Sequence, residues 1–199
     1  MIMPRANMCA VLLDYTTIAI CGGTVNPRQH TSACEKFDLT SHAFSPLPDM
    51  IEPRSNHATV HYRGNIVALG GCSTVNSSQC EQFDPVVCKW TPFPPCDALC
   101  YGAKAAVAAD KIYAVDARVV VDTINVYDGS AWGCVSIEAR YTGPIAGLGG
   151  RLCILSKQKS GDDGRENALY VYDIYAEPWT VSCKVYEGTY HGFTNCVSF

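Results

Sequence analysis

Cysteine and histidine are the residue types in this chain that could ligate a metal ion or react with an oxidant. Twelve of the 199 residues are cysteines, and Cys72, Cys80, Cys88 and Cys96 follow one another at intervals of eight residues. Structural zinc sites are usually anchored on a short Cys-x2-Cys pair, and the sequence contains none. Cysteines within apolar runs, such as Cys21, have the character of small hydrophobic residues. We therefore expect reduced, mostly buried thiols, with a redox-responsive subset and metal ligation as alternatives.

A copper site would need His and Tyr ligands that converge from several strands. The histidines are His30, His42, His57, His61 and His191. His57 and His61 share a face of one predicted strand, and such a pair is typical of packing or of a solvent-exposed surface. We expect neither a metal site nor a cofactor.

Motifs that identify common catalytic sites are absent from the sequence. It has no Gly-x-Ser-x-Gly, no His-Glu-x-x-His and no glycine-rich loop of the phosphate-binding type. The run Gly-Leu-Gly-Gly at 147–150 is interpreted as a turn. We expect no catalytic residues and a protein that is not an enzyme.

Polar and basic side chains in the predicted loops could bind an acidic peptide through charge-assisted hydrogen bonds. Loops on a rigid scaffold are frequent positions for binding residues. The longest predicted loop, residues 156–167, has mixed charge and two glycines. The candidate partner-binding residues are Arg28, His30, Arg54, Asn76, Ser77, Lys157, Lys159 and Arg165.

The elements that would position these residues follow from a repeat. An aromatic-Asp pair occurs four times, at Asp38, Asp84, Asp128 and Asp173, with spacings of 46, 44 and 45 residues. A further aromatic residue follows each pair, at Phe44, Trp90, Trp132 and Trp179. A period of this length indicates a repeated supersecondary unit. We therefore assign the aspartates to turns and the aromatic residues to packing.

Each unit has the pattern of four short strands separated by turn signals. In the second unit these are residues 58–62, 66–69, 80–84 and 88–91, which are rich in apolar and β-branched side chains. Helical periodicity is absent, and this excludes the helical repeat families. Because a four-stranded unit cannot bury both faces alone, the repeat predicts an all-β chain with the architecture of a β-propeller.

Several motifs recur at this period. Gly22-Gly23 and Gly70-Gly71 follow the second strands of the first two units, Trp90 lies in a fourth strand, and Pro4-Arg5 and Pro53-Arg54 precede the units. Together they resemble the kelch repeat over essentially the whole chain. The resemblance implies a kelch-type β-propeller with four four-stranded blades and the first strand of a fifth. The expected ranges are about 4–50, 51–96, 97–139 and 140–187 for the blades, and 188–199 for the fifth.

The later units depart from the pattern. Val115-Asp116 and Ser156-Lys157 stand where the glycine pair is expected. Kelch propellers typically have six blades, whereas this chain supplies four units and one strand. An open arc of four blades would expose the apolar faces of its terminal blades, which monomers rarely tolerate. We therefore expect this chain to be a partial or truncated propeller. Closure with four or five blades and completion by another chain are the alternatives.

The resemblance to the kelch-like family implies a protein-interaction module that binds a protein or peptide segment through its blade loops. Substrate recognition for a cullin ubiquitin ligase adaptor is the more specific role that it suggests. One alternative is an actin or cytoskeletal scaffold, and another is a kelch-type enzyme similar to a sugar mutarotase or a copper oxidase. In kelch-like blades, linker arginines equivalent to Arg5 and Arg54 often pack at the rim of the central channel. Such packing is the alternative to partner binding for Arg54.

Composition restricts the partners further. The formal net charge of −4 disfavours nucleic acid, which binds basic surfaces. No run of about 18 apolar residues is present, so no membrane-spanning helix is expected. The first residues lack the long apolar core of a signal peptide, and a cytoplasmic location is therefore expected.

Overall fold

The computed structural model describes residues 1–73, 79–99, 101–116, 122–137, 142–160, 164–175 and 180–187. The regular structure in these ranges is β-strand throughout, as the repeat predicted. Within them no helix is long and apolar enough to cross a membrane. The expected first strand of a fifth blade, 188–199, lies outside the described residues.

Four four-stranded sheets form the predicted blades. Blade 1 consists of β1 (Cys9–Leu12), β2 (Thr17–Cys21), β5 (Cys34–Asp38) and β6 (Ala43–Leu47). Blade 2 consists of β8 (Ala58–Tyr62), β9 (Asn65–Leu69), β11 (Cys80–Asp84) and β12 (Lys89–Phe93). Blade 3 consists of β13 (Ala103–Ala108), β14 (Lys111–Asp116), β15 (Thr123–Tyr127) and β16 (Trp132–Ser136). Blade 4 consists of β17 (Thr142–Leu148), β18 (Arg151–Ser160), β19 (Gly164–Asp173) and β20 (Thr180–Glu187).

Two short pairs of strands supplement the blades. The hairpin of β3 (Thr24–Asn26) and β4 (Gln29–His30) lies between β2 and β5. The linker strand β7 (Arg54–Ser55) pairs with β10 (Cys72–Ser73), which follows β9. Both pairs lie at the end of the blade where the second strand leaves the sheet, and we call this the loop end.

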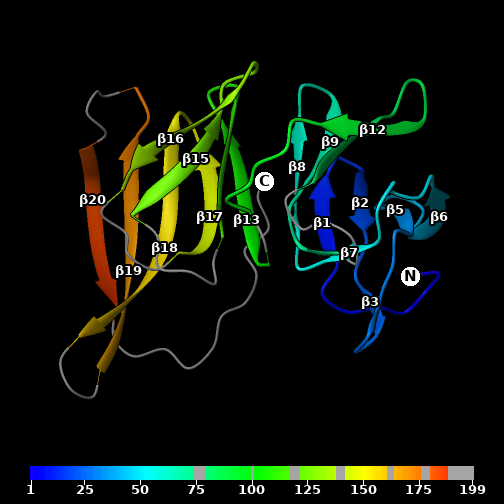
Figure 1. Cartoon of the computed structure of the whole chain (residues 1–199), viewed down its shortest axis with the longest axis horizontal. Helices are drawn as coiled ribbons and strands as arrows, with labels where there is room; N and C mark the ends of the chain where they lie inside the picture. Colours follow the sequence, from blue (N-terminus) through cyan, green and yellow to red (C-terminus); the bar gives the residue numbers. More distant parts are fainter. Residues whose placement is uncertain are drawn as a thin grey trace. The chain divides into compact units, whose positions relative to one another are not determined.

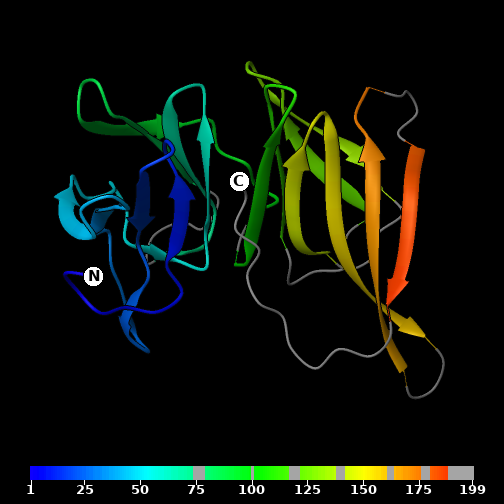
Figure 2. The same ribbon diagram turned by 180° about the vertical axis from the view of Figure 1, so that it is seen from behind.

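The chain divides into two compact units, Met1–Ala103 and Lys104–Ser198. Blades 1 and 2 belong to the first unit, and blades 3 and 4 to the second, apart from the first residue of β13. Figures 1 and 2 show the strands of each blade side by side in both views. Each unit is described below by itself.

The core of the first unit joins its two blades. Val11 and Ala19 of blade 1 are buried in one cluster with Ile66, Phe83 and Trp90 of blade 2. Fully burying one large apolar side chain contributes about 1.5–3 kcal/mol, so this cluster is the main attraction between the sheets. The indole N–H of Trp90 donates to the Pro48 carbonyl at 2.9 Å, which satisfies its polar atom.

The second unit has its own core between blades 3 and 4. Tyr113 and Ile124 of blade 3 pack in one cluster with Leu152, Tyr170 and Tyr172 of blade 4. The two blade 4 tyrosine rings are stacked, with 6.2 Å between their centroids. Alternate residues of β19 thus point into this core, whereas β14 is buried at every position from Ile112 to Asp116.

The repeated aspartates cap the turn after the third strand of each blade, as expected. The Asp38 carboxylate accepts hydrogen bonds from the backbone N–H groups of Thr40 and Ser41 at 2.8 and 2.7 Å. Asp84, Asp128 and Asp173 accept equivalent bonds from residues two or three positions further on. Backbone donation from Ala131 and Ser130, with the Ser130 hydroxyl, lowers the pKa of Asp128 to about 2.

The aromatic residues of the repeat also pack as expected. Across the third and fourth strands the ring centroids lie 4.6 Å apart for Phe37–Phe44, and 5.4 Å apart for both Phe83–Trp90 and Tyr127–Trp132. Trp179 lies outside the described residues. These pairs close the turn end of blades 1, 2 and 3, opposite the loop end.

The glycine pair permits a close approach of the chain to its neighbours. Gly71 has a φ of 94°, and a Cβ there would lie 2.7 Å from the Ser55 carbonyl oxygen and 2.6 Å from the His57 Cβ. Only glycine combines this backbone conformation with that space.

The prediction of a loop at 156–167 was wrong. Strands β18 and β19 run through most of this range and pair residue by residue from Arg151↔Asp173 to Ser160↔Gly164. The polar composition suggested a loop, but continuous pairing with the neighbouring strand gives the backbone its hydrogen bonds there. The predicted loop of blade 1 also contains structure that was not expected, the β3–β4 hairpin.

Candidate partner-binding face

The candidate basic residues occupy very different environments, and Arg54 is the most enclosed of them. Its side chain is fully buried, and its guanidinium contacts the Glu81 carboxylate at 2.8 Å. The same group donates to the carbonyls of Gly70 and Gln79 at 2.8 and 2.7 Å. The other Glu81 oxygen accepts the backbone N–H of Ile51 at 2.6 Å. Partner binding by Arg54 would require this network to open, so we assign the residue to the blade itself.

Arg5 makes the corresponding contact in blade 1. Its guanidinium lies 2.9 Å from Glu35, whose second oxygen accepts the backbone N–H of Ile2 at 2.7 Å. The motif Cys-Glu-x-Phe-Asp at 34–38 and 80–84 could have revealed both glutamates as partners of the linker arginines. Each pair joins a linker to the third strand of its blade.

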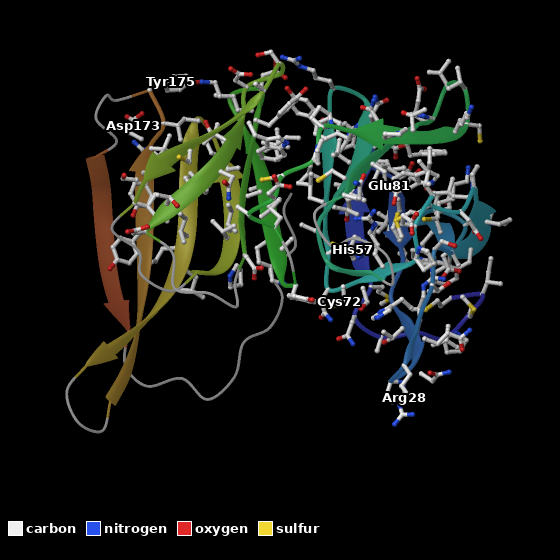
Figure 3. All side chains as sticks on the ribbon, in the orientation of Figure 1. Arg28, His57, Cys72, Glu81, Asp173 and Tyr175 are labelled. Atoms are coloured by element: carbon white, nitrogen blue, oxygen red, sulfur yellow. The ribbon has the colours of Figure 1, made fainter. Side chains whose placement is uncertain are left out.

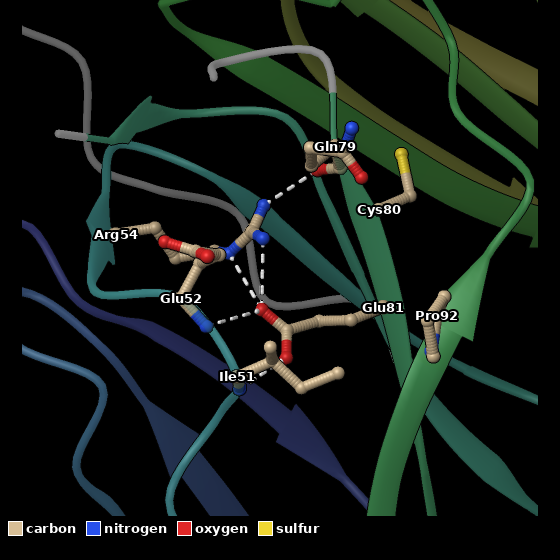
Figure 4. A pocket seen from close by; sticks show the side chains of 7 residues that line it. All are labelled: Ile51, Glu52, Arg54, Gln79, Cys80, Glu81 and Pro92. Atoms are coloured by element: carbon tan, nitrogen blue, oxygen red, sulfur yellow. Dashed lines mark hydrogen bonds and ion pairs between the residues drawn. The ribbon is translucent and has the colours of Figure 1, made fainter. Parts of the chain in front are cut away.

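A cavity of about 270 Å³ lies beside the Arg54–Glu81 pair (Figure 4). It is lined by Ile51, Glu52, Arg54, Gln79, Cys80, Glu81 and Pro92. Burial raises the pKa of the Cys80 thiol, which keeps it protonated and unreactive. Arg54 and Glu81, which line this cavity, form an ion pair with each other. We therefore interpret the cavity as part of the blade's structure and not as an active site.

The β3–β4 hairpin presents Arg28 at the loop end of blade 1. Arg28 is exposed in the turn between the two short strands, where its backbone N–H donates to the Asn26 side chain at 3.1 Å. Figure 3 shows its side chain at the tip of the hairpin, pointing away from the unit. Of the described candidate residues in the first unit, Arg28 is the one with its charge in solvent.

The base of the hairpin is fixed by backbone hydrogen bonds to two linkers. Thr24 and Ala6 exchange bonds of 2.7 and 2.9 Å, and the N–H of Gly23 donates to the Arg54 carbonyl at 2.8 Å. His30, which is half-buried, places its Nδ1 2.9 Å from the Ser55 hydroxyl oxygen. His30 therefore joins the hairpin to β7, and the structure brings it and Arg28 together on one hairpin.

The remaining candidates are distributed differently from the prediction. Asn76 and Ser77 lie outside the described residues. Lys157 and Lys159 are in β18, and Arg165 is in β19, so all belong to paired strands of blade 4. Lys159 is directly opposite Arg165 in the register.

The two histidines expected to share a strand face do not do so. His57 precedes β8 and is buried, whereas His61 lies within β8 and is exposed. Across the described parts of the chain, no group of three or more His, Cys, Asp or Glu residues could hold a metal ion.

The nine cysteines whose side chains the structure describes are free thiols. Four are buried, as expected, but Cys88 and Cys134 are exposed. Cys21 and Cys34 lie directly opposite each other on β2 and β5. A hydrogen bond with Cys34 and burial raise the pKa of the Cys21 thiol well above its usual range.

Comparisons with known proteins agree with this geometry. A family model described as the Kelch motif matches residues 53–96, which contain the linker and strands of blade 2. The solved structure entitled "Structure of YjhT" is similar over 93% of this chain and 72% of that chain, with a TM-score of 0.66 and 14% identity. At this identity the likeness shows the fold alone. No curated protein sequence matches the chain.

The sheet order, the capped turns and these likenesses define a β-propeller fold. Within it, residues 53–96 match the Kelch motif, as the repeat predicted for blade 2. This fold supports a protein-interaction module in general.

Proposed function

We propose that the chain binds a protein or peptide segment through the loop end of its blades. The β3–β4 hairpin carries this proposal, because backbone bonds to Ala6 and Arg54 fix its base while Arg28 is exposed at its tip. Because the backbone that carries Arg28 is fixed before binding, only the side chain has to be ordered when it meets a carboxylate of the partner. The kelch-type fold is consistent with such a role.

The more specific role that we propose is substrate recognition for a cullin ubiquitin ligase adaptor in the cytoplasm, without catalysis by this chain. The resemblance to the kelch-like family supports it. Copper-dependent oxidation or sugar mutarotation by the purified protein would contradict the non-catalytic assignment.

Affinity capture with three forms of the protein tests the binding site. Wild type, Arg28→Ala and the control Lys89→Ala are used side by side. Lys89 is also exposed, but it starts β12 at the turn end of blade 2. A partner that is lost with Arg28→Ala and kept with Lys89→Ala supports the proposal, whereas equal capture by all three forms contradicts it.

The abundance of the captured partner separates the adaptor from a cytoskeletal scaffold. An adaptor for degradation predicts that depletion of this protein raises the partner's abundance, with no further rise when cullin neddylation is blocked. Unchanged abundance, together with co-sedimentation with actin, would favour the scaffold.

A further inference from the structure

Three cysteines of blade 1 lie in one row across adjacent strands. The register places Cys9 of β1 directly opposite Cys21 of β2, and Cys21 directly opposite Cys34 of β5. Directly opposite residues of an antiparallel pair point to the same face of the sheet. The three thiols therefore share the face of blade 1 that packs in the core of the first unit, where Cys21 and Cys34 are buried. We call these three positions the cysteine row.

The repeat does not require this row. Blade 2 contains Cys80 at the position equivalent to Cys34, within the shared Cys-Glu-x-Phe-Asp motif. The residues that continue the row across blade 2 are Leu69 and Ala58. Apolar side chains without a thiol thus complete the row there, so packing alone does not explain the other two thiols of blade 1.

The Cys21–Cys34 pair has the strand geometry that a disulfide requires. The N–H of Gly22 donates to the Ala33 carbonyl at 3.0 Å, so the backbone hydrogen bonds flank the two cysteines instead of joining them. At such a non-hydrogen-bonded position, opposite Cα atoms are about 4.5 Å apart and the side chains lie closest together. A disulfide needs Cα atoms about 4.4–6.8 Å apart. The two strands can therefore be bridged without a change in the backbone.

Cys9 has a different environment from the other two cysteines of the row. It is half-buried, whereas Cys21 has no exposed surface. The Leu13 N–H donates to the Thr17 carbonyl at 2.8 Å. Hydrogen-bonded and non-hydrogen-bonded pairs alternate along β1 and β2, so Cys9↔Cys21 is a hydrogen-bonded pair with about 5.5 Å between its Cα atoms. The geometry therefore favours a bridge between Cys21 and Cys34, and it leaves Cys9 as the thiol nearest to solvent.

We propose that Cys21 and Cys34 form a cross-strand disulfide when hydrogen peroxide oxidises blade 1, with Cys9 as the thiol that reacts first. The two bridged cysteines flank the β3–β4 hairpin, which has Arg28 at its tip. The bond closes residues 21–34 into a covalent loop and fixes the base of this hairpin. The effect on partner binding rests on the proposed function, whereas the formation of the disulfide does not.

The reaction balances in three steps. The Cys9 sulfur takes an OH group from hydrogen peroxide, and the thiol proton leaves with the other OH group as water. Cys21 then attacks this sulfenic acid, the S–O bond breaks as a second water leaves, and a Cys9–Cys21 disulfide forms. Cys34 attacks the Cys21 sulfur and gives its proton to Cys9, which returns to the thiol. Two thiols are thus oxidised to one disulfide, and one peroxide is reduced to two waters.

Tryptic mapping of the oxidised wild type tests the proposal directly. The protein is treated with hydrogen peroxide, its remaining thiols are blocked with N-ethylmaleimide, and it is digested without reductant. Trypsin cleaves after Arg28, so Cys21 and Cys34 fall in separate peptides, 6–28 and 29–36. We expect these peptides to be linked, with a mass two hydrogens below their sum, and to separate when a reductant is added. Absence of the linked pair would overturn the proposal.

Single serine variants assign the bond and the order of the steps. Cys21→Ser and Cys34→Ser should each abolish the linked pair, and its persistence in Cys21→Ser would assign the bond to Cys9 and overturn the proposal. Cys9→Ser should form the pair about tenfold more slowly, and an unchanged rate would contradict the first step. Cys80→Ser is the matched control, because this thiol is similarly buried but lies opposite Leu69. It should keep the wild-type rate, and a loss of the pair there too would contradict the assignment to the row.

Amide hydrogen exchange tests whether the disulfide fixes the hairpin. In the oxidised protein, the N–H groups of Gly22 and Thr31, which form hydrogen bonds at the hairpin base, should exchange about tenfold more slowly. The amides of β11 and β12 in blade 2 are the control and should change less than about twofold. Equal exchange at the hairpin in the oxidised and reduced proteins would overturn this effect of the disulfide.

The disulfide and the proposed function can fail separately. If the linked peptides are found but Arg28→Ala captures the same partner as wild type, the proposed function is wrong and the disulfide stands. If no linked peptides are found but Arg28→Ala loses the partner, the disulfide is wrong and the proposed function stands.

Discussion

Blades 2 and 4 have the same strand order but end their second strands in different ways. In blade 2, β9 ends at Leu69, and Gly70 and Gly71 take φ values of 59° and 94°. In blade 4, Ser156-Lys157 occupies the corresponding position and β18 continues to Ser160. Residues with a Cβ rarely adopt positive φ, so the chain stays extended where the glycines are missing. The departure from the repeat thus coincides with longer second and third strands in this blade.

The same two blades treat their basic residues in opposite ways. Arg54 is buried against Glu81 and two carbonyls in blade 2. In blade 4, Lys159 and Arg165 occupy directly opposite positions of β18 and β19. Arg28, at the tip of the β3–β4 hairpin, has an exposed side chain. Whether a described basic residue is buried therefore depends on its position in the blade and not on its residue type.

The largest effect is expected from breaking the buried network of blade 2. Arg54→Ala removes the cationic partner of the buried Glu81 carboxylate and the guanidinium donor of two carbonyls. Removing one partner of a buried pair costs about 3–5 kcal/mol. Urea unfolding should show a loss of this size in the free energy of unfolding. Arg54→Lys should recover only part of it, since an ammonium cannot reproduce the planar fork; a loss below about 1 kcal/mol in Arg54→Ala would contradict the structural assignment.

The second effect tests why the glycine pair ends the strand. In Gly71→Ala the new Cβ meets the Ser55 carbonyl and His57 at positive φ, and we expect a loss of about 3 kcal/mol. Gly64 is the matched control: its φ is 83°, but a methyl group at that position would have nothing within 4 Å. Gly64→Ala should therefore cost only the backbone strain, about 1 kcal/mol. Equal losses in urea unfolding would show that close packing at Gly71 is unimportant.

The sequence predicted the blades well because their determinants are local and repeated. Each aspartate cap accepts hydrogen bonds from N–H groups two or three residues further along the chain, as Asp84 does. The ring of Phe83 packs against Trp90, just across a tight turn. The extent of β18 could not be predicted in the same way. Its residues from Lys157 onward have the composition of a loop, and their strand conformation depends on pairing with β19.

The candidate site was predictable only in part for a related reason. The exposure of Arg28 follows from its place in a turn, beside Pro27. The burial of Arg54 depends on Glu81, which lies 27 residues away. Basic residues are usually exposed, so the sequence predicted that Arg54 could contact a partner. In the fold, its contact with Glu81 buries it instead.

A smaller effect is expected at the loop end of β18 and β19 in blade 4. Lys159 and Arg165 are directly opposite in the register, and like charges at opposite positions destabilise a strand pair, so Lys159→Gln should stabilise the pairing by about 0.2–1 kcal/mol. Lys157→Gln is the control, because its opposite residue is the neutral Asn167. Amide hydrogen exchange in β18 and β19 should slow in the first variant and stay unchanged in the second. Faster exchange in Lys159→Gln would contradict the register that places the two charges together.

The smallest effect concerns the aspartate caps, which do not differ between the blades. Hydrogen bonds from the backbone N–H groups of Ala131 and Ser130 lower the pKa of Asp128 from 3.8 to about 2. Hydrogen bonds from Ser41 and from the backbone N–H of Thr40 lower the pKa of Asp38. Because the folded pKa lies below the unfolded one, the stability from the Asp128 charge is complete above about pH 4 and is lost as the pH falls toward 2. The difference in unfolding free energy between wild type and Asp128→Asn should shrink over this window. A difference that is constant with pH would mean that the charge of Asp128 contributes nothing to the cap and that its side chain acts by shape alone.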